Sequence, residues 1–302
     1  MKEFTIESRD MKTALACYKW EPKGTPKAVL IVVHGMSEHM MRYTELAEYM
    51  VSQGVVVAGL DLLGHGKSAP SSDEFGYFCE GDPATVIVRD VHRLKKTVQA
   101  EYPGIPVYIM GHSMGSFIVR NYIERYGTGI KGAVIQGGCG TLPAAGIMGK
   151  VLSDIAAFFH GWHYKSTLIT AVILGPYFKA FPGDPNGWLT KRKEVVEAYA
   201  DDPYSGFIFT LNGYHTLAEL TLRAGNRKLM ERIPKDLPLF IVSGEDDPVG
   251  EMGKGVRRMY ESYKKAGFSN VKLDIRPTDR HELHNEEDRY QVFEEIRDFI
   301  LG

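Results

Sequence analysis

The residues that decide the fold read Val107-Tyr-Ile-Met-Gly-His-Ser-Met-Gly-Ser116, an apolar run that leads into Gly-x-Ser-x-Gly and then into a helical pattern. Between a strand and a helix, this pattern is typical of a nucleophile elbow. The turn is so tight that its central residue takes a strained backbone, and glycine on both sides relieves the crowding because it has no Cβ. The hydroxyl of Ser113 is thereby lifted above the start of the helix, where the helix dipole favours a developing negative charge. The pattern predicts Ser113 as a nucleophile.

The segments around this stretch alternate between strand and helix. Residues 28–33 and 55–60 are continuous apolar runs, which are typical of strands buried on both faces. Further strands are expected at residues 4–6, 14–20, 133–136, 239–243 and 271–275, and helices at residues 42–53, 84–101 and 287–301. This alternation predicts an α/β fold with a mostly parallel central sheet covered by helices and opened by an antiparallel pair.

The alternation stops between residues 139 and 223. Aromatic residues are dense in this stretch and are interleaved with proline and glycine. We expect a cap inserted over the active site, with a core domain formed by residues 1–138 and 224–302. The alternative is a loop-rich part of the core. Four cationic residues are candidates for binding a charged head group at the rim of the cap, or else form a solvated helix face: Lys165, Lys191, Arg192 and Lys193.

Length, charge and cysteine content limit the class of protein. The 302 residues are near the upper end of what one hydrophobic core supports, and the formal net charge of -2 gives no field that would recruit nucleic acid or an anionic membrane. Cys17, Cys79 and Cys139 lack metal-ligand spacing and are expected to be free thiols in a reducing compartment. There is no apolar signal region and no apolar run long enough to span a bilayer. We therefore expect a soluble, cytoplasmic protein.

Three neighbouring carboxylates compete for the role of the acid that orients a catalytic base. Ser243-Gly-Glu-Asp-Asp-Pro-Val249 follows a predicted strand, at the edge where the strand ends face the ligand crevice. Mutual repulsion disfavours all three carboxylates pointing into one pocket. The spacing Gly-x-x-Asp-x-Val favours Asp247, with Asp246 as the alternative and Glu245 as a solvated loop charge.

Two histidines compete for the role of general base. Imidazole suits this role because its pKa lies near neutrality, and a carboxylate partner fixes its tautomer. His281 and His284 both lie between the last predicted strand and the last predicted helix. His281 is favoured because it lies nearer the end of the strand, whereas His284 is a candidate for the first helical turn. Nucleophile, acid and base then follow in the order Ser, Asp, His.

A fourth motif, His34-Gly-Met36, follows the apolar run 28–33. Its glycine allows the loop to turn back under a substrate, so that the N–H groups of Met36 and Met114 form an oxyanion hole. We expect structural roles for His34, for His112 in the elbow, and for the loop from Asp61 to Ser68, which lacks the spacing of a phosphate loop.

Together these motifs resemble those of the monoacylglycerol lipase and lysophospholipase group of α/β-hydrolases, which is also grouped with serine aminopeptidase-like hydrolases. The resemblance rests on His34-Gly-Met-Ser-Glu-His39, Asp61-x-x-Gly-His-Gly-x-Ser68, Gly111-His-Ser-Met-Gly115, Gly244-x-x-Asp247-x-Val249 and Arg280-His281-Glu. It covers about residues 4–136 and 238–302. It implies the α/β-hydrolase fold, Ser113 as nucleophile, Asp247 as acid, His281 as base and the N–H groups of Met36 and Met114 as the oxyanion hole, with no metal or organic cofactor.

The expected function is hydrolysis of a carboxylic ester through an acyl-enzyme on Ser113. The resemblance implies a small-molecule acyl ester or lipid as substrate, namely a monoacylglycerol, a lysophospholipid or a short acyl ester. The predicted cap does not match the cap of that group, which leaves the substrate open. One alternative is a peptidase, which would need an acidic group for a free amine, such as Glu38, Asp201 or Asp202. The other is a non-catalytic receptor. The sequence does not predict the oligomeric state.

Overall fold

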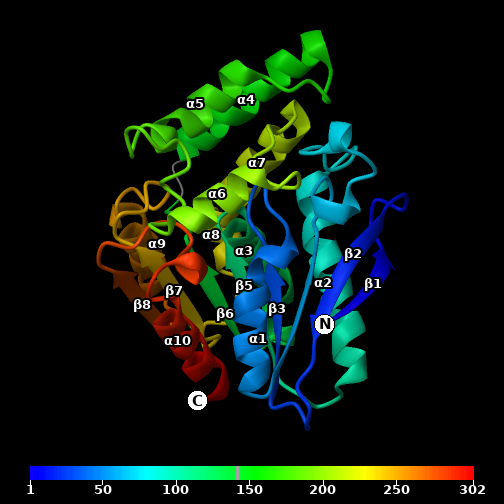
Figure 1. Cartoon of the computed structure of the whole chain (residues 1–302), viewed down its shortest axis with the longest axis vertical. Helices are drawn as coiled ribbons and strands as arrows, with labels where there is room; N and C mark the ends of the chain where they lie inside the picture. The colour runs from blue at the N-terminus through cyan, green and yellow to red at the C-terminus, as the bar shows by residue number, and fades with distance from the viewer. Residues whose placement is uncertain (141–142) are drawn as a thin grey trace.

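The computed structural model describes residues 1–140 and 143–302, and its centre is an eight-stranded sheet with the order β1-β2-β4-β3-β5-β6-β7-β8 (Figure 1). The strands are β1 (Lys2–Glu7), β2 (Ala14–Trp20), β3 (Ala28–Val33), β4 (Val55–Leu60), β5 (Val107–His112), β6 (Gly132–Gln136), β7 (Leu239–Gly244) and β8 (Val271–Arg276). β2 pairs antiparallel with β1 and β4, and all other neighbours pair parallel. The predicted mostly parallel sheet is confirmed.

Helices cover both faces of the sheet, as predicted. They are α1 (Thr44–Ser52), α2 (Pro83–Glu101), α3 (Met114–Tyr126), α4 (Pro143–His160), α5 (Thr167–Phe178), α6 (Lys193–Asp201), α7 (Leu211–Ala224), α8 (Arg227–Met230), α9 (Lys254–Lys265) and α10 (Arg289–Leu301). The helix expected at residues 42–53 is preceded by a 3₁₀ turn, Met40–Tyr43, and becomes α-helical only at Thr44.

Two hydrophobic cores lie on opposite faces of the sheet because successive side chains of a strand point to opposite faces. In β3, Val29, Ile31 and Val33 belong to the core under α2, α3 and α9, whereas Leu30 and Val32 belong to the core under α1 and α10. All six residues of β3 are buried, which explains why the strand reads as a continuous apolar run.

The turn between β5 and α3 has the geometry of an elbow. Ser113 takes φ 53° and ψ -119°, a conformation that L-residues rarely adopt. A Cβ at Gly111 would lie 2.2 Å from the carbonyl oxygen of Gly115, and a Cβ at Gly115 would lie 2.2 Å from that of Val33. Both contacts are too short for any side chain. Glycine at the two flanks therefore lets the start of α3 touch both its own strand and β3.

The chain between β6 and β7 forms α4 to α8. In Figure 1, α4 and α5 lie beyond the ends of the strands, at the top of the molecule, and α7 lies beneath them. α7 contacts both α4 and α3, and its residues Leu211, Tyr214 and Leu220 are buried in the main core. α7 ends at Ala224, one residue after the expected boundary at residue 223, so the expected cap segment includes a helix that is buried in the core.

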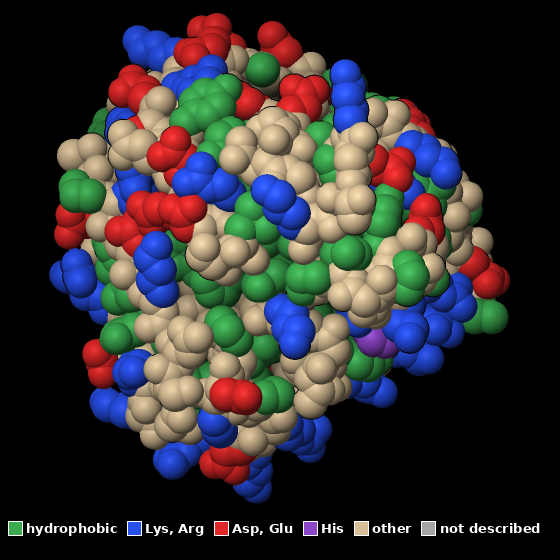
Figure 2. Space-filling view, turned by 90° about the horizontal axis from the view of Figure 1, so that it is seen from below, with side chains coloured by type: hydrophobic (Ala, Val, Ile, Leu, Met, Phe, Trp, Pro, Cys, Tyr) green, Lys and Arg blue, Asp and Glu red, His purple; other side chains and the backbone are tan. Residues whose placement is uncertain are grey.

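Large apolar side chains are exposed mainly on α4 and α5. The exposed fraction reaches 84 % for Phe158 and 74 % for Leu168. Others on these helices are Ile147, Met148, Val151, Leu152, Ile155, Phe159, Val172 and Phe178. Figure 2 shows the opposite end of the molecule, where Lys and Arg are intermingled with Asp and Glu. Large exposed apolar side chains are thus concentrated on α4 and α5. None of the helices in the described residues has the length and apolarity that crossing a membrane requires.

Candidate active site

The residues predicted for the site come from one edge of the sheet. Ser113 directly follows β5, Asp247 follows β7, His281 lies in the loop between β8 and α10, and Met36 follows β3. These four strands run parallel, so their carboxyl ends meet at the same edge, where α/β proteins bind their ligands. The topology therefore brings together side chains that are far apart in the sequence.

The structure places Asp247 against His281. The Oδ2 atom of Asp247 lies 3.0 Å from Nδ1 of His281, and Oδ1 accepts a hydrogen bond of 2.8 Å from the N–H of Val249. Asp247 is fully buried. Asp246 is exposed, and Glu245 forms a surface ion pair with Arg257. The geometry favours Asp247 over its neighbours for orienting the imidazole.

Ser113 and His281 line the same cavity. Nε2 of His281 is buried and makes no hydrogen bond to any residue in the described part of the chain, so it does not bond Ser113 in this conformation. Trp188 lies beside the imidazole, with 5.0 Å between the ring centres, and its carbonyl accepts a 3.3 Å hydrogen bond from the N–H of His281. The catalytic hydrogen bonds of a ligand-free enzyme often tighten only when substrate binds.

Two backbone N–H groups are available beside Ser113. Within the described residues, neither the N–H of Met36 nor that of Met114 has a hydrogen-bond acceptor. Met114 is the first residue of α3, where the helix dipole favours negative charge. A Cβ at Gly35 would lie 2.5 Å from Oε1 of Glu38 and 3.1 Å from Cβ of Ser113. Only glycine lets the loop that carries Met36 approach the nucleophile this closely.

His284, the alternative base, points elsewhere. Its Nδ1 accepts a 2.6 Å hydrogen bond from Nε2 of Gln136, and its ring stacks on Tyr43 with 4.4 Å between centres. Burial lowers the pKa of His284 to about 3, so the ring stays neutral. His284 therefore contributes packing and a hydrogen bond beneath the site, and of the two histidines it is His281 that contacts Asp247.

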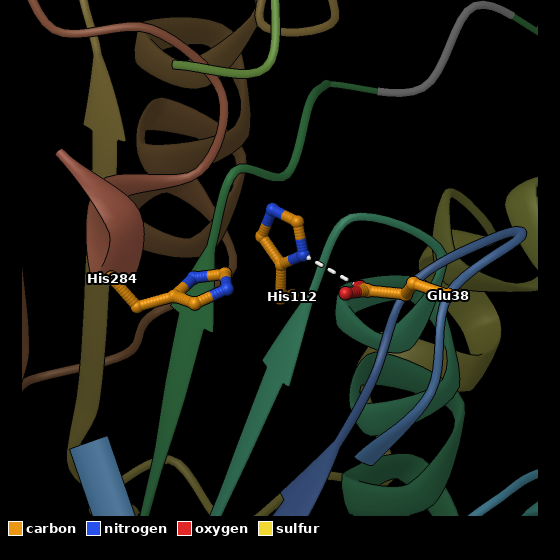
Figure 3. Close-up of side chains that lie close together, drawn as sticks. All are labelled: Glu38, His112 and His284. Carbon is orange, nitrogen blue, oxygen red and sulfur yellow. Dashed lines mark hydrogen bonds and ion pairs between the residues drawn. The ribbon is translucent and has the colours of Figure 1, made fainter. Parts of the chain in front are cut away.

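Glu38, His112 and His284 lie close together under the elbow, on the loop after β3, at the end of β5 and after β8 (Figure 3). Their ligand atoms lie within 4.8 Å of one another, which is compatible with a metal ion. The oxygens of Glu38, however, already accept hydrogen bonds from Gly35 (2.5 Å), Tyr43 (2.8 Å) and Arg42 (2.9 Å), and Nδ1 of His112 lies 3.1 Å away. A metal would have to displace the guanidinium, so we interpret this cluster as a hydrogen-bond network.

Arg42 links two loops of the site. Its guanidinium binds both oxygens of Glu282, at 2.6 and 2.7 Å, and one oxygen of Glu38 at 2.9 Å. Burial would raise the pKa of both carboxyls, but the positive charge of Arg42 outweighs it. The pKa of Glu282 falls to about 2, and His112 and Arg42 hold the pKa of Glu38 well below its usual range. The loop that carries His281 is thereby tied to the loop that carries Met36.

Sequence reasoning missed Arg42, Glu282 and Trp188. Arg42 and Glu282 are 240 positions apart, and the pair leaves no local pattern. Glu282 stands within the motif Arg280-His281-Glu, Arg42 lies three residues after the motif that ends at His39, and Trp188 adjoins no motif. The structural roles expected for His34 and Asp61 match the contacts observed. Nε2 of His34 accepts from the N–H of Leu62 at 2.9 Å, and Asp61 accepts from the N–H groups of Met40 and Lys67.

The cavity at the site has a volume of about 140 Å³ and walls that are mostly apolar. They include Met36, Met114, Phe117, Ile173, Leu174, Tyr177, Phe178, Trp188, Leu189, Tyr199, Phe207, Leu217 and Val249. Among the described residues, no lysine or arginine lines it. Lys191 pairs with Asp279 at 2.7 Å and Arg192 with Glu194 at 2.7 Å, so the cations expected at the rim of the cap do not face this cavity.

Comparisons with known proteins find one family model and several similar lipases and esterases. Residues 24–288 match the family model described as serine aminopeptidase, S33. The chain is 28 % identical over 290 residues to the monoglyceride lipase of Homo sapiens, which covers 95 % of this chain and 86 % of the lipase. It is 26 % identical to a monoacylglycerol lipase of Mycolicibacterium smegmatis, over 94 % of this chain and 91 % of that protein. A thermostable carboxyl esterase from Bacillus coagulans, solved with glycerol, has a TM-score of 0.92 and 29 % identity, over 100 % of this chain and 99 % of that chain.

Replacing Asp247 with Asn tests the assignment of the acid. We expect kcat to fall by about 10⁴-fold with the fold intact, because the amide leaves the imidazole in the wrong tautomer. Asp246→Asn, the matched control, removes a neighbouring exposed carboxylate and should change kcat by less than about threefold, because the side chain does not contact His281. Steady-state kinetics on p-nitrophenyl butyrate measure both variants. The opposite ranking would transfer the role to Asp246.

The pH dependence of activity tests the base. Burial alone would lower the pKa of His281, but the Asp247 carboxylate outweighs it, and the pKa is raised above 6.5. Only neutral imidazole accepts a proton, so kcat/KM should fall as the pH drops through this raised pKa. In Asp247→Asn, the residual kcat/KM should fall at a lower pH because the carboxylate no longer stabilises the imidazolium. A profile of the unmodified protein that is flat between pH 5 and 8 would exclude His281 as the base.

Proposed function

Since the chain belongs to the serine aminopeptidase S33 family, we propose that it is a serine hydrolase that cleaves uncharged carboxylic esters. The observation that carries this proposal is that Ser113, on its elbow, and His281, paired with Asp247, line one apolar cavity. A strained serine, an oriented imidazole and a buried carboxylate are the groups that acyl transfer requires. The similarity to two lipases and a carboxyl esterase supports an ester as the bond that is cleaved.

In the proposed mechanism, the hydroxyl of Ser113 attacks the acyl carbonyl and Nε2 of His281 accepts its proton. Asp247 accepts a hydrogen bond from Nδ1–H and stabilises the imidazolium. The N–H groups of Met36 and Met114 bind the oxyanion, and each such donor contributes about 10²–10³-fold in kcat. The imidazolium then protonates the leaving alcohol, and an acyl-enzyme remains. A water molecule, deprotonated by His281, attacks the acyl-enzyme and regenerates Ser113.

The cavity supports a short or medium acyl chain. An engineered cavity of about 150 Å³ holds benzene, so the cavity of about 140 Å³ holds roughly six carbon atoms. Its polar groups, Ser37, Asn186 and Tyr199, are uncharged donors and acceptors suited to the hydroxyls of an alcohol. Glu38 and Glu282 also line it, which disfavours the phosphate of a lysophospholipid. We therefore propose that monoacylglycerols of short or medium chain, and simpler esters, are better substrates than lysophospholipids.

We propose that residues 139–223 act as a cap that selects the acyl group. Ile173, Tyr177, Trp188 and Tyr199 of this segment wall the cavity above Ser113. The outer faces of α4 and α5 expose large apolar side chains, which suits a protein that takes an apolar substrate from a lipid phase. The core then supplies the reacting groups, and the inserted segment supplies the fit to the acyl chain.

A peptidase is less well supported, because two of the three acidic groups suggested for binding an amine are engaged elsewhere, and the third, Asp201, is exposed and does not line the cavity. Glu38 is buried and bound by Arg42 and His112. Asp202 pairs with His39 at 2.7 Å and accepts hydrogen bonds from Ser205 and from the N–H of Tyr204. A free α-ammonium group would have to displace one of these partners.

The chain-length dependence of activity tests this proposal. With p-nitrophenyl acetate, butyrate, hexanoate, octanoate and laurate, kcat/KM should rise by about fourfold per added methylene, which corresponds to about 0.8 kcal/mol of burial. The rise should stop near about six carbons, when the cavity is full. A steady decline from acetate onwards would exclude an acyl pocket. Faster cleavage of aminoacyl anilides than of esters would favour the peptidase.

A matched pair of variants places the acyl pocket. Ile173→Trp adds volume inside the cavity and should move the plateau to shorter chains, with activity on acetate retained. Val172→Trp changes the neighbouring residue of α5, which is 48 % exposed and does not line the cavity, and should leave the profile unchanged. The same shift of the plateau in both variants would show that the cavity wall at Ile173 does not bind the acyl chain.

A further inference from the structure

A second cavity, of about 330 Å³, lies between α3, α8 and α9 and shares no lining residue with the cavity at Ser113. Among the described residues, its lining contains four cationic side chains and no carboxylate. The cations are Arg120, Arg227, Arg258 and Lys265. The first cavity is apolar with two carboxylates, so the two cavities suit ligands of opposite chemistry.

Arg120, from α3, is the buried member of this group. Its exposed fraction is 2 %, and its terminal nitrogens donate to the carbonyls of Cys139 (3.0 Å) and Ala224 (2.7 Å). Its Nε has no acceptor, and its guanidinium has no ion pair, among the described residues. A buried charge without a partner of opposite sign is costly. A bound anion would supply the opposite charge that the described residues do not place in an ion pair with Arg120.

No carboxylate in the described part of the chain forms an ion pair with Arg120. Glu124, one helical turn after Arg120, forms no ion pair with it, and burial raises the pKa of Glu124 to about 8, so that it is largely protonated at neutral pH. Arg258 pairs with Glu251, and Arg227 pairs with Glu231 at 3.6 Å. These pairs leave the charge of Arg120 uncompensated.

We propose that this cavity binds a phosphate-bearing small molecule, with the phosphate held by Arg120 and Lys265 and by Arg258, which would exchange Glu251 for the phosphate. Arginine suits this role because its planar guanidinium binds phosphate oxygens in pairs, and several converging cations match a dianion. The volume of about 330 Å³ lies in the range of small-molecule sites, and Met230 and Met259 add apolar surface for an attached group.

The second cavity lies beside both ends of the segment formed by residues 139–223. Arg120 holds the carbonyls of Cys139 and Ala224, which lie at the two ends of the inserted segment. The anion site therefore adjoins the points where the chain leaves and re-enters the core. Phe117, one turn earlier on α3, lines the active-site cavity, and the guanidinium of Arg120 lies 5.7 Å from its ring centre.

Isothermal titration calorimetry with inorganic phosphate and with AMP, at constant ionic strength, tests this proposal. Both probes should bind saturably to the unmodified protein. In the double variant Arg258→Gln/Lys265→Gln, the Kd of each probe should rise by at least about tenfold, because two charge-assisted contacts are lost. Tighter binding of AMP than of phosphate would support a phosphate ester as the ligand, and equal binding would support free phosphate.

Arg257→Gln/Lys264→Gln is the matched control. These residues directly precede Arg258 and Lys265 on α9, do not line the cavity, and carry the same charge. The control should bind both probes as tightly as the unmodified protein. The absence of saturable binding to the unmodified protein, or an equal loss in both double variants, would overturn the proposal. Hydrolysis of p-nitrophenyl butyrate by each variant reports separately on folding and on the proposed function.

Discussion

The close approach of backbone to backbone at the elbow is the constraint on which the rest of the site depends. The start of α3 lies so near β3 that a single Cβ at Gly115 would contact the carbonyl of Val33. This contact fixes Ser113 at φ 53° and brings the loop after β3 over the nucleophile. Met36 and Met114 then line the same cavity as the serine. A side chain at Gly35 or Gly115 would separate the nucleophile from its oxyanion donors.

A network of buried charges supports this geometry from below. Arg42 lies between Glu38 and Glu282, and Glu282 is covalently next to His281. Removing one partner of a buried ion pair costs about 3–5 kcal/mol because the remaining charge is left without compensation. The network therefore ties the loop of the base to the loop of the oxyanion hole. Arg42 acts as a positioning residue, because it contacts Glu38 and Glu282 and does not line the cavity.

The local patterns of the sequence predict the sheet well and the inserted segment poorly. β3 and β4 match the apolar runs at residues 28–33 and 55–60. A strand that is buried on both faces is a continuous apolar run, so it can be identified from its own residues alone. The elbow at Ser113 is predicted because the whole motif that defines it consists of five consecutive residues, Gly111 to Gly115. α4 and α5 are not predicted, and Pro176 even lies inside α5. Their helices depend on tertiary packing, and long-range pairs such as Arg42 with Glu282 leave no local signal.

The most direct test of the account is to identify the residue that reacts with a fluorophosphonate probe. The probe phosphonylates an activated serine, and mass spectrometry of the digested protein locates the adduct. We expect one adduct, on Ser113, with loss of ester hydrolysis in proportion to labelling, and neither labelling nor hydrolysis in Ser113→Ala. Labelling of another serine, or hydrolysis that persists in Ser113→Ala, would contradict it.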